Sequence, residues 1–443
     1  MSDARETARG VLAAVGTGAK LDTVLHETVH PGDLDLRDRN YAVRLVKVVL
    51  RNRTLLDYQV SFFAKRPAAG IQPGLLDILR VAAAELCFMR TADYAAVNEA
   101  VGAARAGFGK KAAGFTNAVL RRIAEAPEPI LPDKRDETVY LSVKYSYPEW
   151  LVKRWLKRLG RAECEKLLAV NNTDAPLYVV HNPLRTTGCE LAEAIREAGA
   201  DAETGPLETT RVELRGKSIA EVPPLTDGRA LIVDPSSTLG VRALSPPRGA
   251  FVLDMCAGIG GKTRQISWAV GPSGRVLATD NIAAKVGVLA SNAAKYGMEN
   301  VQPIVADLTR PLVRGLSYIL VDAPCSNTGV LRRKPDIRWR LKEEDLTGHA
   351  ALQLALLSEG VRSLLVPGGK LVYQTCSTEP EENERVVEAI LAAFPELELE
   401  TPAGDLFNAY VDGKYLRAWP QRHGTNGAFV AGVRKKNVRE RER

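Results

Sequence analysis

Apolar positions recur every three to four residues throughout residues 1–125, which is the period of an amphipathic helix. The pattern is clear in the stretches 8–18, 38–64, 75–89 and 115–126. Breaks fall at Pro31–Gly32 and between Pro67 and Pro73, where proline and glycine interrupt regular structure. This part of the chain is therefore predicted to be an all-helical domain of six or seven helices.

Residues 126–136 carry a cluster of prolines and are predicted to be a linker. Beyond it, residues 137–225 mix two helical patterns (147–160 and 162–172), a strand pattern (176–182) and a further helix (189–199), followed by short strands with turn signals. A small α+β subdomain is expected here.

From residue 226 to 436 short apolar runs alternate with helical stretches. The runs are 251–255, 275–280, 301–308, 318–324 and 370–376. Such alternation is typical of an open, mostly parallel α/β sheet with helices on both faces. The run 427–435 is predicted to add a last, edge strand, and residues 437–443 form a basic tail.

Composition excludes some classes of protein. The 443 residues contain no apolar run long enough to span a membrane and no secretory h-region at the start, so a cytoplasmic protein without membrane contact is expected. Six cysteines lack CxxC or metal-ligand spacing, which predicts free thiols and no metal. The net charge of +7 is concentrated near the two ends. It favours a polyanionic partner, although a solvated basic surface explains it equally well.

Carboxylates stand at the ends of four successive predicted strands: Asp254, Asp280, Asp307 and Asp322. The next strand ends at Cys376. Ligands of open α/β sheets bind beyond the carboxyl ends of the strands, so these side chains are expected to share one rim.

The loop after Asp254 contains Gly258, Gly260 and Gly261, whose backbone can approach a ligand closely at a helix N-terminus. Its GxGG spacing is neither the dinucleotide GxGxxG nor the P-loop, which argues against a nicotinamide dehydrogenase. A glycine-rich turn alone is weak evidence. With Asp280 placed for ribose hydroxyls and Asp307 near an adenine, a nucleoside cofactor such as S-adenosylmethionine becomes the better interpretation.

Two thiols follow neighbouring strands, Cys325 in DAPC and Cys376 in QTCS. A lone cysteine is most often a small buried hydrophobe, but a pair on one rim is harder to explain by packing. Methylation of a pyrimidine at C5 uses such a pair: a thiolate adds to C6, C5 attacks a sulfonium methyl, and the C5 proton then leaves. Asp322 is placed to share a proton with N3. The residues alone leave open which cysteine attacks.

Two charged stretches accompany these motifs. The segment RRKPDIRWR (332–340) combines five cations with a tryptophan, which suits phosphate contacts and stacking on bases, although a charged loop is a common alternative. The segment EPEENE (379–384) is predicted to begin the helix after Cys376, because acidic residues are favoured at a helix N-terminus.

The combined motifs DMCAGIGGKT, ATDN, ADLT, VDAPCSNTG, RRKPDIRW and QTCSTEPEENE resemble those of the RNA cytosine-C5 methyltransferases, in particular the bacterial small-subunit rRNA family RsmB (Sun/Fmu). The stretches 37–57, 96–101 and 110–123 resemble the NusB-like RNA-binding domain. The resemblance implies an all-helical NusB-like RNA-binding domain (1–125), a small RNA-binding α+β subdomain (137–225) and a Rossmann-like class I S-adenosylmethionine-dependent methyltransferase sheet (226–436).

The resemblance also implies roles for residues. Cys376 is the nucleophile, Cys325 assists proton removal and release, and Asp322 is catalytic. The residues expected to bind S-adenosylmethionine are Cys256, Ala257, Gly258, Ile259, Gly260, Gly261, Lys262, Asp280, Asp307 and Asp322.

By resemblance, the substrate is cytosine 967 of 16S rRNA. A monomeric protein is expected. The alternative is an RNA-binding scaffold without turnover. Its support is Gly258–Ile259, where the family usually has Ala-Pro.

Overall fold

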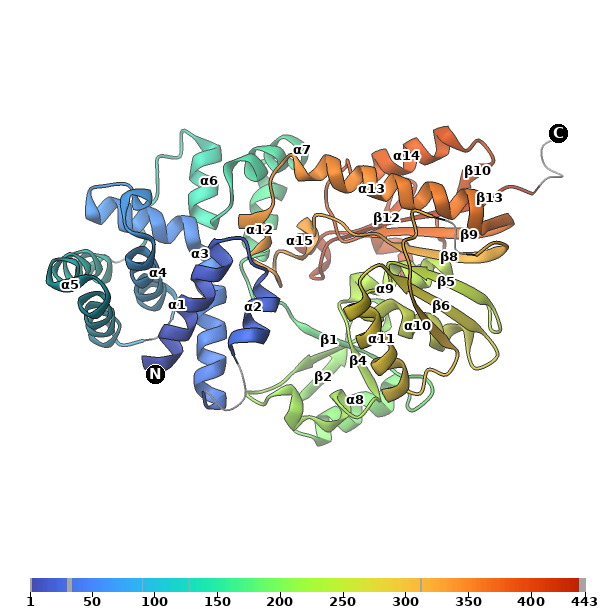
Figure 1. The fold of residues 1–443 in the computed structure, drawn as a ribbon, viewed down its shortest axis with the longest axis horizontal. Helices are drawn as coiled ribbons and strands as arrows, with labels where there is room; N and C mark the ends of the chain where they lie inside the picture. The colour runs from blue at the N-terminus through green and yellow to red at the C-terminus, as the bar shows by residue number, and fades with distance from the viewer. Residues whose placement is uncertain (1, 30–33, 90, 127, 311–312, 438–443) are drawn as a thin grey trace. The chain divides into compact units, whose positions relative to one another are not determined.

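The computed structural model describes residues 2–29, 34–89, 91–126, 128–310 and 313–437 (Figure 1). The chain forms two compact units. One contains residues 1–173 together with 331–343, and the other contains 174–330 together with 344–443. The division cuts through the range 137–225, so the subdomain boundaries proposed from the sequence stay predictions. Of the expected basic tail, all but Asn437 lies outside the described residues.

The first unit is helical in its described part (Figure 1). Its helices are α1 (Ser2–Gly16), α2 (Leu21–Thr28), α3 (Leu36–Ala64), the 3₁₀ turn Ala68–Gly70, α4 (Pro73–Phe88), α5 (Asp93–Glu125), α6 (Glu137–Tyr145), α7 (Glu149–Val170) and α12 (Ile337–Arg340). Kinks at Asn52, Gly109 and Gly160 divide α3, α5 and α7. The described part of residues 2–125 thus contains α1 to α5, and with α3 and α5 each divided by its kink these make seven helical segments, in agreement with the predicted six or seven.

The segment 331–343 packs into this unit, far in sequence from its other members. Arg338 is fully buried, donates to Ser146 O (3.0 Å) and Asn172 Oδ1 (2.8 Å), and lies over the Tyr147 ring at 3.8 Å. Trp339 Nε1 donates to Leu50 O at 2.8 Å. The prediction that Arg338 contacts a phosphate is therefore wrong, because its guanidinium is used inside the fold. Trp339 is partly exposed, so base stacking by its ring stays a prediction.

The second unit begins with a small antiparallel sheet in the order β2-β3-β1-β4. Its elements are β1 (Leu177–His181), α8 (Gly188–Glu197), β2 (Asp201–Thr204), the 3₁₀ turn Pro206–Glu208, β3 (Thr210–Glu213), the 3₁₀ turns Ile219–Glu221 and Pro223–Leu225, and β4 (Ala230–Ile232). Leu191 and Ile195 of α8 pack against Val179 and Val212 of the strands and close a small core.

A nine-stranded sheet forms the rest of the unit, in the order β11-β12-β13-β9-β8-β5-β6-β7 with β10 paired to β13. Its strands are β5 (Phe251–Met255), β6 (Arg275–Asp280), β7 (Val301–Val305), β8 (Leu316–Asp322), β9 (Leu365–Thr375), β10 (Leu397–Leu399), β11 (Val411–Asp412), β12 (Tyr415–Ala418) and β13 (Ala428–Lys435). Strands β7, β6, β5, β8 and β9 are parallel, and the others pair antiparallel. The predicted α/β class is confirmed.

Strand β13 was expected at an edge, and this is wrong. It lies between β9 and β12 and also pairs with β10. Its sequence is almost continuously apolar because it is buried on both faces, which is typical of an internal strand.

Helices cover both faces of the sheet (Figure 1). They are α9 (Pro235–Leu244), α10 (Gly261–Val270), α11 (Ala283–Lys295), α13 (Asp345–Glu359) with the π turn Gly360–Leu364, α14 (Glu384–Ala393) and α15 (Pro420–His423), with 3₁₀ turns at Thr328–Val330 and Asp405–Tyr410. No helix in the described ranges is long and apolar enough to cross a membrane. The strand order reverses between β5 and β8, the point where such sheets bind ligands.

Candidate active site

The two thiols meet beyond the ends of β8 and β9. These strands are parallel neighbours with Asp322 opposite Gln374, so the residues that follow them enter the same space. Cys325 Sγ lies 3.1 Å from Cys376 Sγ. Cys325 is buried, whereas Cys376 is partly exposed. The structure therefore brings together the two cysteines that the sequence singled out.

Asn327 bridges the same two loops. Cys376 Sγ donates to its Oδ1 at 3.0 Å, and its Nδ2 donates to Cys325 O at 2.7 Å. Its φ of 62° is in the left-handed region, which asparagine tolerates better than most residues. Sequence reasoning missed Asn327. The available signal was its position two residues after Cys325 in a turn.

Glu382 lies beneath the thiols and is completely buried. It was expected to belong to the start of a helix, but α14 begins only at Glu384, and the preceding residues form a turn. The carboxylate of Glu382 instead accepts hydrogen bonds from Ser326 and Ser377, the residues that follow the two cysteines. The acidic stretch therefore supports the thiol loops.

Lys262 and Asp322 form an ion pair beside the thiols, with Nζ 2.5 Å from Oδ2. Burial by itself would lower the pKa of Lys262, but the negative charge of Asp322 and the hydrogen bond with its carboxylate outweigh this effect, so the pKa is raised. Lys262 is in the first turn of α10, which directs it back over the strand ends. It is a permanent cation within the field of Cys376.

A cavity of about 160 Å³ opens on the same rim. Four of the predicted cofactor residues line it, namely Cys256, Asp280, Asp307 and Asp322, together with Pro324, Leu352 and Leu356. The other predicted residues, 257–262, form the adjoining loop and the first turn of α10. This combination offers carboxylates and an apolar wall from α13 to a ligand that has polar and apolar parts.

Asp280 holds the glycine loop in place. Its Oδ2 accepts from Gly258 N and its Oδ1 from Ile282 N, both at 3.0 Å, and Lys285 Nζ lies 3.5 Å from Oδ2. Gly258 has a φ of 58°, which disfavours a side chain. Among the described residues, no atom comes within 4 Å of a Cβ added to Gly258 or Gly261. The loop therefore presents open backbone to a ligand.

The remaining predicted residues are placed less centrally. Asp307 is exposed, and hydrogen bonds from Thr309 lower its pKa. Burial raises the pKa of Cys256 to about 12, which leaves it an unreactive thiol. Ala257 N donates to Thr279 O, and the Ile259 side chain is 57% exposed.

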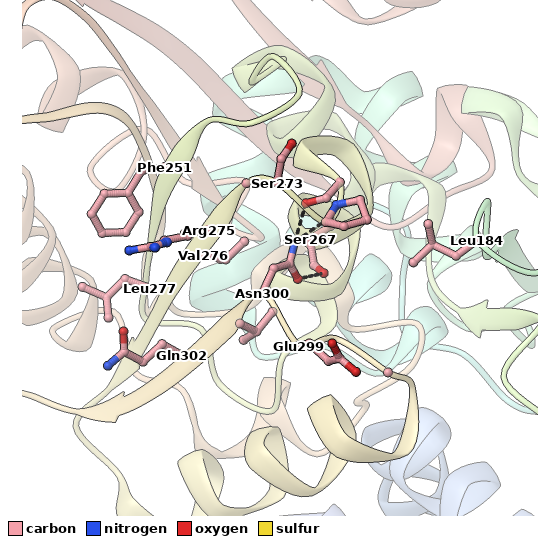
Figure 2. Close-up of a pocket in the computed structure, with 15 residues that line it drawn as sticks. Leu184, Phe251, Ser267, Ser273, Arg275, Val276, Leu277, Glu299, Asn300 and Gln302 are labelled. Carbon is pink, nitrogen blue, oxygen red and sulfur yellow. Dashed lines mark hydrogen bonds between the residues drawn. The ribbon is translucent and has the colours of Figure 1, made fainter.

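The amino ends of the same strands line a second, larger cavity of about 910 Å³. Figure 2 shows Phe251, Arg275 and Gln302 on one side of it and Asn300 hydrogen-bonded to Ser267 on the other. The thiols and the carboxylates of Asp280 and Asp322 lie at the opposite ends of the strands. Across the described ranges, no group of His, Cys, Asp and Glu is arranged to hold a metal ion.

Comparison with known proteins gives this geometry a family. Family models match residues 2–125 (NusB family), 147–218 (ferredoxin-like domain of RsmF/B-like methyltransferases) and 241–434 (16S rRNA methyltransferase RsmB/F). A probable ribosomal RNA small subunit methyltransferase B of Bacillus subtilis is 31% identical over 93% of this chain and 94% of its own. The chain belongs to the RsmB family of S-adenosylmethionine-dependent 16S rRNA methyltransferases.

Solved structures agree with this membership. The crystal structure of PH0851 covers 97% of this chain and 99% of its own with a TM-score of 0.80; at 23% identity it shows the fold. A methyltransferase homolog from Pyrococcus horikoshii covers 68% of this RsmB-family chain and 99% of its own, with 26% identity and a TM-score of 0.57. The resemblance seen in the sequence is confirmed.

Proposed function

We propose that the protein is a cytoplasmic, monomeric enzyme that transfers a methyl group to C5 of one cytosine in 16S rRNA, cytosine 967 by family resemblance, through a covalent bond between Cys376 and C6. The observation that carries the proposal is the pair of thiols 3.1 Å apart next to a cavity lined by carboxylates. Methylation at an exocyclic nitrogen or a ribose hydroxyl needs neither thiol, whereas C5 methylation uses a nucleophile and a group that assists release.

The cavity residues fit S-adenosylmethionine. The open backbone at Gly258 and Gly261 allows close approach, Asp280 suits ribose hydroxyls, Asp307 suits the adenine amino group, and Leu352 with Leu356 suits the flat ring. The carboxylates also complement a sulfonium cation. The cofactor supplies an electrophilic methyl group when it is bound.

The protein's own groups then have distinct tasks. Cys376 gives up its thiol proton as its Sγ forms a bond to C6, the C5–C6 double bond opens, and C5 becomes electron-rich. The ring takes up one proton at N3 in exchange, and the Asp322 carboxylate accepts a hydrogen bond from that N3–H and stabilises the adduct. Lys262 holds Asp322 in place and contributes a positive charge near the attacking sulfur. After methyl transfer, Cys325 assists removal of the C5 proton, and the bond between Cys376 and C6 breaks as the C5–C6 double bond re-forms.

The test uses 16S rRNA that lacks the methyl group, labelled S-adenosylmethionine and the full-length protein. Wild type should label one cytosine, identified by mapping. The Cys325→Ala variant should accumulate a covalent protein–RNA complex that survives denaturing electrophoresis, because attack proceeds while release is blocked. Absence of label with wild type would contradict the proposal and favour an RNA-binding scaffold.

A further inference from the structure

We propose that Glu382 is a positioning residue for the methyl transfer: its buried carboxylate joins the two cysteine-bearing loops and fixes the distance between the thiols. The proposal rests on the roles given above to Cys325 and Cys376. It adds a residue that touches neither substrate nor cofactor.

The carboxylate makes one contact set with each loop. Glu382 Oε1 accepts from Ser326 N at 2.8 Å, and Oε2 accepts from the hydroxyls of Ser326 and Ser377. Ser326 directly follows Cys325, and Ser377 directly follows Cys376. Two loops 51 residues apart in sequence are therefore held by the two oxygens of one side chain.

Neighbouring elements fix the carboxylate itself. Gln353 of α13 donates to Glu382 Oε1 at 3.1 Å and to Pro324 O at 2.9 Å. Tyr373 OH on β9 donates to Glu382 O at 2.5 Å. Gln353 thus ties the carboxylate to α13, and Tyr373 ties the backbone carbonyl of Glu382 to β9, so both elements restrain the residue that joins the thiol loops.

A buried carboxylate is a costly way to join two loops, since its charge loses hydration and must be compensated by hydrogen bonds. Glu382 is 0% exposed and receives hydrogen bonds at both oxygens. The same carboxylate also contributes to the environment of Cys325. The hydrogen bond with Cys376, burial and the charges of Cys376 and Glu382 together raise the pKa of Cys325 well above its usual value. These interactions favour the neutral thiol of Cys325 while Cys376 is free; the contributions of Cys376 disappear once its Sγ is bonded to C6, when Cys325 has to assist removal of the C5 proton.

The first test measures thiol geometry without any RNA or cofactor. Diamide accepts the two thiol hydrogens as a disulfide forms between Cys325 and Cys376, and mass spectrometry follows the bond over time. Glu382→Ala should slow its formation at least about fivefold relative to wild type, because the loops separate. Glu382→Gln should stay within about twofold, since its amide NH2 can donate to both serine hydroxyls while its oxygen still accepts from Ser326 N and Gln353.

A milder variant covers the case in which Glu382→Ala fails to fold. Ser377→Ala removes the hydroxyl that joins the carboxylate to the Cys376 loop and keeps the buried carboxylate in place; it also removes the contacts of this hydroxyl with Glu379 N, Ser326 and Thr328. It should slow disulfide formation by about two- to threefold. An unchanged rate in Ser377→Ala and in folded Glu382→Ala would overturn the proposal.

The second test is steady-state methyl transfer. Glu382→Ala should lower kcat by at least about tenfold with KM for RNA and cofactor unchanged, and Glu382→Gln should restore kcat to within about threefold of wild type. Equal kcat for wild type and Glu382→Ala would overturn the proposal. If wild type itself transfers no methyl group, the proposed function fails, and the disulfide rates alone decide whether Glu382 sets the thiol geometry.

Discussion

The two cavities at opposite ends of the parallel strands differ in the chemistry of the residues around them, and the smaller cavity has the more reactive groups. The one at the amino ends measures about 910 Å³ and is lined by residues that begin strands, such as Phe251 and Arg275, and by the turns that precede them. The one at the carboxyl ends measures about 160 Å³ but adjoins an ion pair, a glycine loop and two thiols in contact.

The difference follows from the topology. At the carboxyl ends, the strand order reverses between β5 and β8, so the following loops separate and leave room for functional groups. At the amino ends, the chain arrives from helices through tight turns such as 271–274, where Gly271 O accepts hydrogen bonds from Asn300 Nδ2 and Gly274 N. Reactivity is therefore expected at the smaller cavity.

The largest effect should come from Cys376→Ala. Loss of the nucleophile should reduce methyl transfer at least about a thousandfold, since no C6 adduct can form. Arg275→Ala at the other cavity is the matched control and should stay within about twofold of wild type. Labelled methyl incorporation measures both. A comparable loss of methyl transfer in Arg275→Ala would contradict the conclusion that catalysis takes place only at the carboxyl ends of the strands.

Lys262→Met should have the next largest effect. It removes the cation from the field of Cys376 and frees Asp322, and loss of a charged hydrogen bond of about 1.5–3 kcal/mol corresponds to roughly a 10- to 100-fold fall in kcat/KM. Lys285→Met serves as control, because Lys285 is exposed and its ion pair with Asp280 is long, so a change below about threefold is expected. A larger loss of kcat/KM in Lys285→Met than in Lys262→Met would contradict this prediction and would show that Lys285 is the more important cation.

Asp280→Ala should act on cofactor binding more than on chemistry. The variant loses the acceptor for Gly258 N and Ile282 N, which fixes the glycine loop, and the Kd for S-adenosylmethionine should rise about tenfold or more. Calorimetric titration measures this without RNA. Asp307→Ala, an exposed carboxylate bonded to Thr309 of its own turn, should raise Kd less. A larger rise in Kd for Asp307→Ala than for Asp280→Ala would indicate that Asp307, rather than Asp280, binds the ribose hydroxyls.

The functional residues at the carboxyl ends of the strands could be predicted from the sequence, because the prediction needs only the order of the strands and the residues that follow each of them. Parallel strands place their ends on one rim, so Asp280, Asp322, Cys325 and Cys376 were bound to converge once an α/β sheet was inferred. The same reasoning could not distinguish Asp254 from the carboxylates that line the cavity. Asp254 also stands at the end of a predicted strand, but its side chain is completely buried. Alternation along a strand, not position at its end, decides which face a side chain occupies.

What escaped prediction depends on contacts distant in sequence. Glu382 sits in an acidic run that matches a helix start, and its role is visible only when Ser326 and Ser377 are brought beneath it. Arg338 and Trp339 have the composition of a nucleic-acid contact, yet they pack in the helical unit. Charged and aromatic residues predict a surface role only where no partner within the fold is available, and composition does not show such partners.

The smallest expected effect concerns Asp254, the strand-end carboxylate that does not line the cavity. Burial raises the pKa of Asp254 from 3.8 to about 7, and within the described structure its Oδ1 has no hydrogen-bond partner. The folded state therefore keeps a proton that the unfolded chain releases near pH 4, so wild type loses stability as the pH rises towards 7.

Asp254→Asn removes this titration, and any penalty from its new amide is the same at every pH. The free energy of unfolding of the variant, measured in urea, should therefore rise relative to wild type between about pH 4 and pH 7, while methyl transfer at neutral pH changes less than about threefold. A difference that does not vary with pH would mean that Asp254 is already ionised in the folded protein. The carboxyl end of β5 would then contribute a fourth negative charge beside the thiols rather than a neutral, packed side chain.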